Sequence, residues 1–255
     1  MSSQEVLVGS TDRPANHFLR HLNDRDFALV APYLEHGEAV ANQILYNAGD
    51  EIESVLFPCG PCLVSYVVAI EDGREIESIL VGREGLVGST DSDAYLPAYS
   101  GIVVKVGGPL VRLPVDELAA AKLQSASLRE AFARYASCLL AQLLQSTACN
   151  AVHSIEQRAA KWINSAIERT GNAVVPFTHE QLASMLGVGR SYASRVIQTF
   201  KNENIVETRR GAIVVRNRAA LHVRSCGCNT WVMNYFEEVL GGVYSKPEKS
   251  EDARG

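Results

Sequence analysis

Residues 177–216 read FTHEQLASMLGVGRSYASRVIQTFKNENIVETRRGAIVVR, and this stretch decides the fold. Thr178 is placed as a helix cap, and Gln181 three positions later completes a capping box. A short apolar helix is expected to follow, and Gly187-Val188-Gly189 forms a tight turn whose apolar centre can fill a corner between two helices. A second helix is predicted over about 189–202. The segment therefore has the helix-turn-helix pattern, in which the second helix enters the major groove of DNA.

One face of the second predicted helix is polar and lacks acidic residues. At about 100° per residue it spans roughly 140° and contains Arg190, Ser191, Ser194, Arg195, Gln198, Lys201 and Asn202. The opposite face contains Ala193, Val196, Ile197 and Phe200. An ordinary surface helix would mix Glu and Asp into its polar face. Because Arg can bond guanine O6 and N7 together, Arg190 and Arg195 are predicted to read bases, helped by Ser191 and Ser194.

Other residues of this stretch are predicted to contact the sugar-phosphate backbone. Thr178 and His179 begin the first helix, whose backbone N–H groups can meet a phosphate, and Gln198 is a further anchor. Residues 205–215 predict a hairpin, or wing, with Arg209 and Arg210 at its tip. The alternative is that these two arginines belong to a solvated turn.

Charge is distributed unevenly along the 255 residues. Residues 1–125 contain 8 Lys/Arg and 18 Asp/Glu, a net charge of -10, whereas residues 158–224 contain 11 basic and 4 acidic residues, a net of +7. A basic segment in an acidic chain is typical of a nucleic-acid-binding module, although chance clustering is the simpler alternative.

The fold class is predicted to be α+β, with a β-rich N-terminal domain ahead of a long helix. Short strand-like runs such as 64–70 and 75–81, separated by turns such as 71–74, suggest a small β-roll. Residues 116–155 lack Gly and Pro, and their apolar stripe predicts a helix; it contains Leu128, Phe132, Tyr135, Leu139, Leu143 and Ser146. A second copy of the helix is the favoured partner for this stripe, and burial within one monomer is the alternative.

The order of acidic β-roll, long helix and basic winged helix-turn-helix resembles the Crp/Fnr transcription regulators of bacteria. That resemblance covers roughly residues 16–240 and implies a cyclic-nucleotide-binding-like domain over 16–115, a dimerisation helix over 116–155 and a DNA-binding domain over 156–240. It also implies a homodimer on a pseudo-palindromic DNA site and contact with RNA polymerase.

Particular residues bear on this resemblance. Arg190 and Arg195 occupy the two places from which the family's recognition helix reads bases. The family's usual Glu after the first Arg is Ser191 here, which puts the usual target sequence in doubt. The runs Val81-Gly82-Arg83-Glu84-Gly85-Leu86-Val87-Gly88 and Ser225-Cys226-Gly227-Cys228 are similar to one subgroup.

The predicted effector pocket departs from the cyclic-nucleotide binders of this fold. Those proteins hold the cyclic phosphate with a Gly-Glu turn and an Arg about ten residues later, since a buried anion needs a positive partner. Residues 84–99 contain no Arg or Lys. We therefore expect no response to cyclic AMP or cyclic GMP. Glu84, Gly85, Tyr95 and Tyr99 are the candidates for a pocket whose ligand is unidentified.

The motif Cys59-Gly60-Pro61-Cys62 occurs at the reactive centre of thioredoxin-type oxidoreductases, where it begins a helix. Here a β-type run follows it, so we expect a loop with structural cysteines. A redox- or metal-responsive sensor that uses Cys59 and Cys62 is the alternative function. A zinc site joining this pair to Cys226 and Cys228 would need distant predicted domains to meet. Cys138 and Cys149 are expected to be packing residues, so no metal or cofactor is predicted.

The remaining features indicate a cytoplasmic binding protein. The sequence contains no Ser/His/Asp grouping and no phosphate-binding loop that would indicate an enzyme. Its six histidines are scattered. The first residues lack the pattern of a secretory signal, and no apolar run reaches the length of a membrane span. The tail over 245–255 is charged and is expected to be disordered.

Overall fold

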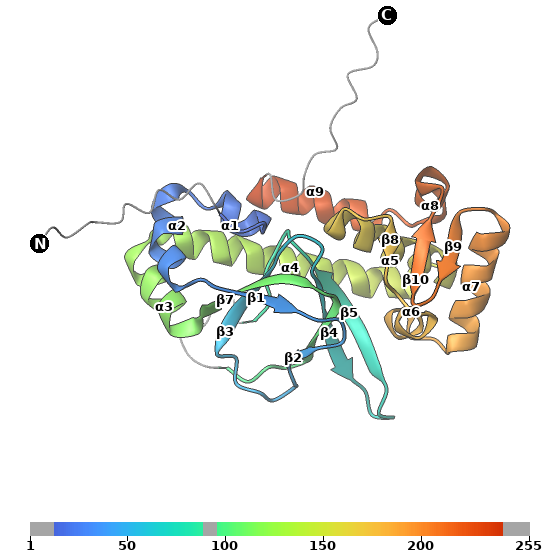
Figure 1. Cartoon of the computed structure of the whole chain (residues 1–255), viewed down its shortest axis with the longest axis horizontal. Coiled ribbons are helices and arrows are strands. Elements are labelled where there is room, and N and C mark those ends of the chain that lie inside the picture. The colour runs from blue at the N-terminus through green and yellow to red at the C-terminus, as the bar shows by residue number, and fades with distance from the viewer. Residues whose placement is uncertain (1–12, 89–95, 242–255) are drawn as a thin grey trace, which may run out of the picture.

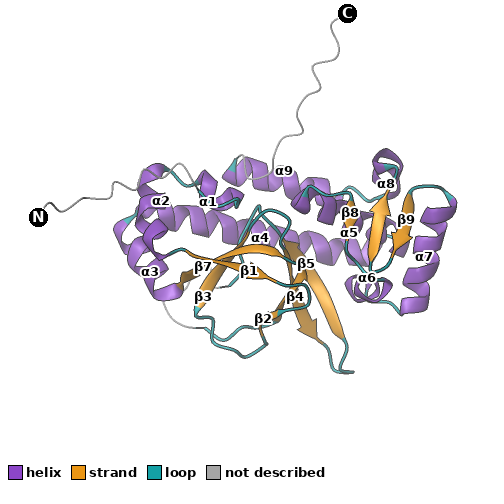
Figure 2. Ribbon diagram, in the orientation of Figure 1, coloured by secondary structure: helices purple, strands orange, loops and turns teal. Residues whose placement is uncertain are grey.

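The computed structural model describes residues 13–88 and 96–241. The predicted tail over 245–255 and the candidate pocket residue Tyr95 lie outside these ranges. Figures 1 and 2 show the predicted mixture of a β-rich N-terminal part, a long helix and a C-terminal part with helices and a small sheet. The α+β fold class is thereby confirmed.

The β-roll consists of two antiparallel sheets with the strand orders β1-β7-β3 and β2-β6-β4-β5. Its strands are β1 (Glu35–Ala39), β2 (Ile44–Tyr46), β3 (Ser54–Pro58), β4 (Leu63–Ala69), β5 (Glu75–Val81), β6 (Gly101–Val106) and β7 (Gly108–Pro114). The predicted hairpin is confirmed, because Ala69 pairs with Glu75 across the turn. Two short helices precede the roll, α1 (His17–His21) and α2 (Asp24–Val30), followed by the 3-10 turn η1 (Ala31–Tyr33).

The helix predicted over 116–155 is interrupted. It forms α3 (Val115–Gln124) and α4 (Ala126–Val152), because Ser125 adopts an extended backbone between them. The Ser125 side chain accepts from the backbone N–H of Leu128 and so caps α4. Serine favours such caps over helix interiors, which explains why a stretch without Gly or Pro still breaks here.

The predicted apolar stripe of α4 does not form one continuous dimer surface. Leu128, Phe132 and Tyr135 are buried in the core of the β-roll in the same chain. Burial within the monomer, the less favoured alternative, therefore applies to this part of the stripe. Farther along α4, Leu140, Leu143 and Leu144 are exposed.

The C-terminal part begins at α5 and ends with a helix that returns to α4. Its elements are α5 (Ile155–Thr170), β8 (Val174–Val175), α6 (His179–Leu186), α7 (Arg190–Asn202), β9 (Val206–Arg209), β10 (Ala212–Val215), α8 (Arg218–Arg224) and α9 (Cys228–Leu240). The strands form a sheet in the order β8-β10-β9. Figure 1 shows α9 lying beside α4, away from α6 and α7.

The two main cores do not follow the predicted domain limits. Val232, Phe236 and Leu240 of α9 join the core of the β-roll. Conversely, Leu63 and Leu80 of the roll belong to the core beneath the helix-turn-helix. Within the predicted unit 156–240, the apolar face of α9 therefore packs against α4 and the β-roll and not against the helix-turn-helix.

A buried ion pair also joins the two parts. Arg169 Nε of α5 lies 2.8 Å from Glu84 Oε1, and both side chains are almost wholly buried. Within the described residues, no helix is long and apolar enough to cross a membrane.

Candidate DNA-binding surface

The first helix of the predicted helix-turn-helix is α6, and its boundaries follow from local chemistry. Both hydrogen bonds of the predicted capping box are present between Thr178 and Gln181. The helix ends at Gly187, whose φ of 66° is a left-handed conformation that favours glycine. Val188 then packs against the second core, so the predicted corner residue is confirmed.

The second helix, α7, buries its predicted apolar face and exposes its polar face. Ala193, Val196, Ile197 and Phe200 are buried. The predicted polar face is exposed at Arg190, Ser191, Arg195 and Gln198. The guanidinium of Arg195 lies 5.1 Å from the centre of the Tyr192 ring, a cation–π contact that supports the arginine from the side.

Two polar side chains of this face, Ser194 and Gln198, already form hydrogen bonds within the chain. Ser194 is half-buried, and its hydroxyl lies 2.9 Å from His179 Nδ1. Burial lowers the pKa of His179, and Arg190 and Lys201 lower it further, so the neutral ring is favoured. Gln198 Nε2 donates to Asn202 Oδ1 at 2.8 Å along the same helix. Ser194 therefore links α7 to the start of α6 in this structure.

The predicted wing is the hairpin β9–β10. Ala212 pairs with Arg209, and Arg209 and Arg210 lie at the exposed turn. A groove of about 460 Å³ lies between the wing, the start of α6 and the start of α7. Its lining includes Thr178, His179, Arg190 and Arg209. The structure thus brings four predicted DNA contacts from three elements around one hollow.

The positive charge on this surface is uncompensated within the described part of the chain. Arg190, Arg195, Arg209 and Arg210 form no ion pair there. By contrast, Arg216 pairs with Glu207 and Arg224 with Glu203 in the same domain. Arginines without acidic partners are available to other hydrogen-bond acceptors. In DNA these are the anionic phosphates and the neutral acceptors on the base edges.

Three of the four candidates for the effector pocket, Glu84, Gly85 and Tyr99, lie within the described residues. Glu84 is buried in its ion pair with Arg169, whereas Tyr99 is 90% exposed. At Gly85, an added Cβ would lie 2.2 Å from the hydroxyl oxygen of Tyr135. That hydroxyl donates to Leu86 O at 2.7 Å and accepts from Leu86 N–H at 2.9 Å. Tyr135 and Arg169 therefore occupy the space beside Glu84 and Gly85, whereas Tyr99 is exposed, and the effector pocket stays a prediction.

Cys59 and Cys62 lie in the loop between β3 and β4, as predicted, and both are buried. Burial raises the pKa of Cys59 to about 11 and that of Cys62 to about 12. Since the thiolate is the reactive form, neither thiol is poised to react at neutral pH. The structure does not favour the alternative of a sensor built on this pair.

A different group of thiols meets at the end of α4. Cys149, His153, Cys226 and Cys228 offer ligand atoms that all lie within 4.8 Å of one another, and we call them the Cys/His cluster. This cluster was not predicted from the sequence, in which Cys149 was interpreted as a packing residue. The spacing of Cys149 and His153, one helical turn apart, is a signal that could have identified half of the cluster.

Comparisons with known proteins agree with this geometry. Residues 155–224 match the family described as Crp-like helix-turn-helix domain. FixK2 from Bradyrhizobium japonicum has a similar structure, with a TM-score of 0.64 at 13% identity over 76% of this chain and 98% of that one. A transcriptional regulator of the crp/fnr family from Eubacterium rectale matches with a TM-score of 0.61 at 18% identity over 80% and 95%.

A third solved structure is also similar. The c-di-GMP responsive global regulator CLP from Xanthomonas campestris matches with a TM-score of 0.61 at 13% identity over 76% of this chain and 99% of that one. At these identities the likeness shows a shared fold. No curated protein matches the sequence.

Proposed function

We propose that this chain, a transcription regulator with the Crp/Fnr fold and a Crp-like helix-turn-helix domain, binds specific duplex DNA as a homodimer. One observation carries the proposal. The exposed face of α7 is free of acidic residues, and its Arg190 and Arg195 stand without carboxylate partners in the described chain. The regulators of similar fold support a binding protein and not an enzyme.

The side chains of this surface divide into two groups. Arg190 and Arg195, with Ser191 and Ser194, would read base edges in the major groove. Thr178, His179, Gln198, Arg209 and Arg210 would anchor phosphates. The hydrogen bond between His179 and Ser194 supports a shared role, in which the phosphate-facing end of α6 orients the reading helix. Contact with RNA polymerase would then turn DNA binding into regulation.

Exposed leucines support the homodimer. Leu140, Leu143 and Leu144 lie on the second half of α4, and Leu144 has 63% of its surface exposed. A second copy of α4 would cover them across a two-fold axis. Such a dimer would place two copies of α7 in successive major grooves about 34 Å apart on a pseudo-palindromic site.

The absence of a response to cyclic AMP is also part of the proposal. A cyclic phosphate buried beside Glu84 would need a cation, and Arg169 already pairs with that carboxylate. Calorimetric titration of the purified chain with cyclic AMP and cyclic GMP tests this statement. Micromolar binding of either nucleotide would contradict it.

The DNA-binding role is tested by selecting duplexes from a random pool and measuring affinity by fluorescence anisotropy over a range of salt concentrations. Arg195→Ala should cost about 1–3 kcal/mol on the selected site and relax the preference at one position. Arg210→Ala should weaken all duplexes alike and reduce the salt slope by about one. Arg224→Ala is the matched control, because this arginine already pairs with Glu203.

Two results would contradict the proposal. If the wild-type chain binds no duplex at low salt, DNA binding itself is wrong. If Arg195→Ala and Arg210→Ala change affinity and salt dependence equally, the division between base reading and phosphate anchoring is wrong, although DNA binding would stand.

A further inference from the structure

We propose that the Cys/His cluster binds one thiophilic divalent cation of the zinc class, which ties the end of α4 to the start of α9. The ligands would be the thiolates of Cys149, Cys226 and Cys228 and the imidazole of His153. Three cysteines and one histidine form a common ligand set for structural zinc.

The distances between the ligand atoms suit a single tetrahedral ion. Cys149 Sγ lies 3.6 Å from Cys226 Sγ, and Cys228 Sγ lies 3.5 Å from His153 Nδ1. With bonds of about 2.3 Å to sulfur and about 2.0 Å to nitrogen, tetrahedral geometry separates two sulfurs by roughly 3.8 Å and sulfur from nitrogen by roughly 3.5 Å. The remaining pairs, all within 4.8 Å, need only small movements to reach these values.

Rigid local structure presents the ligands from two sides. Cys149 lies in the last turn of α4, and His153 is the capping residue of that helix, with its backbone N–H bonded to Cys149 O at 3.1 Å. Cys226 and Cys228 flank Gly227 where α8 gives way to α9. Cys228 is the first residue of α9, where the helix dipole favours a thiolate.

The surroundings supply positive charge that the described carboxylates do not neutralise. Arg158 and Lys161 of α5 are buried, and neither forms an ion pair within the described residues. Arg158 acts electrostatically on Cys149 and Cys226, and Lys161 on Cys149. The Nε of Arg158 is buried and has no hydrogen-bond partner in that part of the chain. A zinc ion with three thiolates carries a net charge of about -1, which two such cations would offset.

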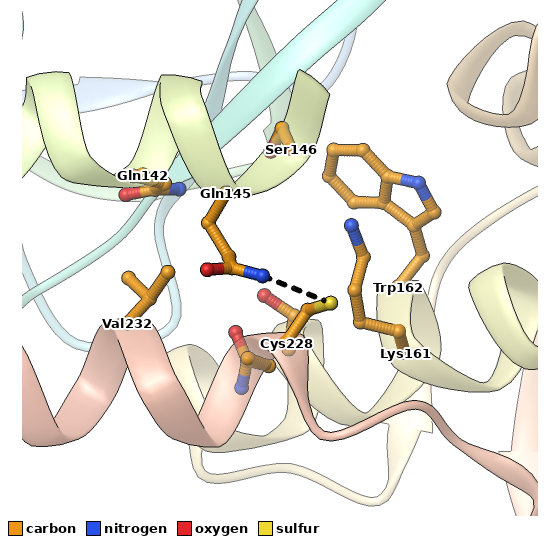
Figure 3. A pocket seen from close by; sticks show the side chains of 9 residues that line it. Gln142, Gln145, Ser146, Lys161, Trp162, Cys228 and Val232 are labelled. Carbon is orange, nitrogen blue, oxygen red and sulfur yellow. Dashed lines mark hydrogen bonds between the residues drawn. The ribbon is translucent and has the colours of Figure 1, made fainter. Parts of the chain in front are cut away.

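A polar side chain also supports one of the sulfurs. Figure 3 shows the Gln145 amide directed at Cys228, and Gln145 Nε2 lies 3.2 Å from Cys228 Sγ. Lys161 of α5 lines the same small cavity, with its ammonium group 4.8 Å from the centre of the Trp162 ring (Figure 3). A cavity of about 20 Å³ borders Cys228 here. Donors around coordinating groups orient them and tune the metal.

Two simpler explanations account for less of this geometry. The three cysteines form a small buried cluster apart from both main cores, as packing residues can. Packing alone, however, gives no reason for a histidine nitrogen and two buried cations at the same place. A Cys149–Cys226 disulfide would use two of the four groups and leave Cys228 and His153 without a role.

The bound metal would have a mechanical consequence. It would join the second half of α4 to the segment between α8 and α9. Arg158, which lies beside the cluster, donates from Nη2 to Leu186 O at the end of α6, at 3.0 Å, and so connects the cluster to the helix-turn-helix. Loss of the metal, or oxidation of its thiolates, would loosen the hold of α4 on the helix-turn-helix.

The test begins with the full chain purified under anaerobic conditions without chelators. Elemental analysis should find about one zinc ion per subunit. After chelation, titration with Co²⁺ should produce the visible absorption of a tetrahedral site and a thiolate-to-metal charge-transfer band, both removed by added Zn²⁺.

Variants locate the site. Cys149→Ser and Cys226→Ser should abolish the charge-transfer band, while Cys138→Ser should keep it, since Cys138 is equally buried on the same helix but outside the cluster. His153→Ala, at a half-buried position, should keep a weaker band and lower Co²⁺ affinity at least about tenfold. Circular dichroism checks that each variant is folded.

Several outcomes would overturn the proposal. They are a wild-type chain that takes up neither zinc nor cobalt, a mass and thiol count that show a Cys149–Cys226 disulfide in place of metal, an iron–sulfur absorption spectrum, and an unchanged cobalt band in Cys149→Ser. If the cysteine variants do not fold, the wild-type titration and His153→Ala still decide the question. None of these measurements depends on DNA binding.

Discussion

Both halves of α4 contain apolar residues, but the rest of the chain buries those of the first half and leaves several in the second half exposed. Leu128, Phe132 and Tyr135 in the first half are buried by the chain's own β-roll and α9, whereas Leu140 and Leu144 in the second half are exposed. The second half then ends in the Cys/His cluster. Periodicity thus identifies apolar positions along a helix, while the tertiary neighbours decide which of them are buried within the chain.

The largest loss of stability is expected when a large side chain is removed from the first half of α4. Phe132 is buried, and its ring packs edge-on against Phe18 with centroids 5.0 Å apart. Phe132→Ala should lower the free energy of unfolding by about 3–5 kcal/mol, because it leaves a cavity in a close-packed core. Urea denaturation followed by circular dichroism measures the loss. Leu123→Ala, at a 78% exposed position on α3, is the control, and an equal loss there would contradict the assignment.

The next effect concerns the ion pair that joins the turn beside Tyr135 to α5. Glu84→Gln should lower the free energy of unfolding by about 3 kcal/mol, since it removes the charged acceptor from a buried, hydrogen-bonded ion pair. Glu130→Gln breaks an exposed pair with Arg134 on α4 and should cost at most about 1 kcal/mol. Thermal and urea unfolding of both variants would compare them, and similar costs would show that the buried pair does not stabilise the junction.

A smaller loss is expected at the hydroxyl of Tyr135. Tyr135→Phe removes both hydrogen bonds to the backbone of Leu86 and leaves these groups buried, so about 2 kcal/mol of unfolding free energy should be lost. Hydrogen exchange should speed up at Leu86 in particular. Tyr99→Phe, at the 90% exposed position, should change neither quantity. Unchanged exchange at Leu86 would argue against the two hydrogen bonds.

The smallest effect on the fold, with the largest on assembly, is expected in the second half of α4. Leu140→Glu combined with Leu144→Glu should change the folding of a single subunit by less than about 0.5 kcal/mol, because both residues are exposed there. The double variant should nevertheless be monomeric by sedimentation, since two pairs of carboxylates would face each other across the two-fold axis. Leu123→Glu should leave assembly unchanged. A dimer that survives the double change would place the interface elsewhere.

Local chemistry explains which elements could be predicted. The helix-turn-helix follows from sequence because its signals act within a few residues: the capping box at Thr178, the turn at Gly187 and the two-faced pattern of α7. The loop at Cys59-Gly60-Pro61-Cys62 follows for the same reason. The break at Ser125 was missed, because serine is compatible with either a helix or a cap until Asp26 binds its hydroxyl. The contacts of Arg169 with Glu84 and of Tyr135 with the next turn were missed for a similar reason, since these partners are far apart in sequence.

The order of β-roll, long helix and helix-turn-helix, and the acid-free polar face of α7, followed from the sequence alone, because they depend on periodicity, caps and local composition. Only the tertiary structure decided the return of α9 to α4, the ion pair between Glu84 and Arg169, and the meeting of Cys149 with Cys226. The two cysteines are 77 positions apart in sequence, and the residues of the ion pair are 85 apart. Nothing in the local pattern of either partner encodes the position of the other, so such contacts follow from the packing of the whole chain.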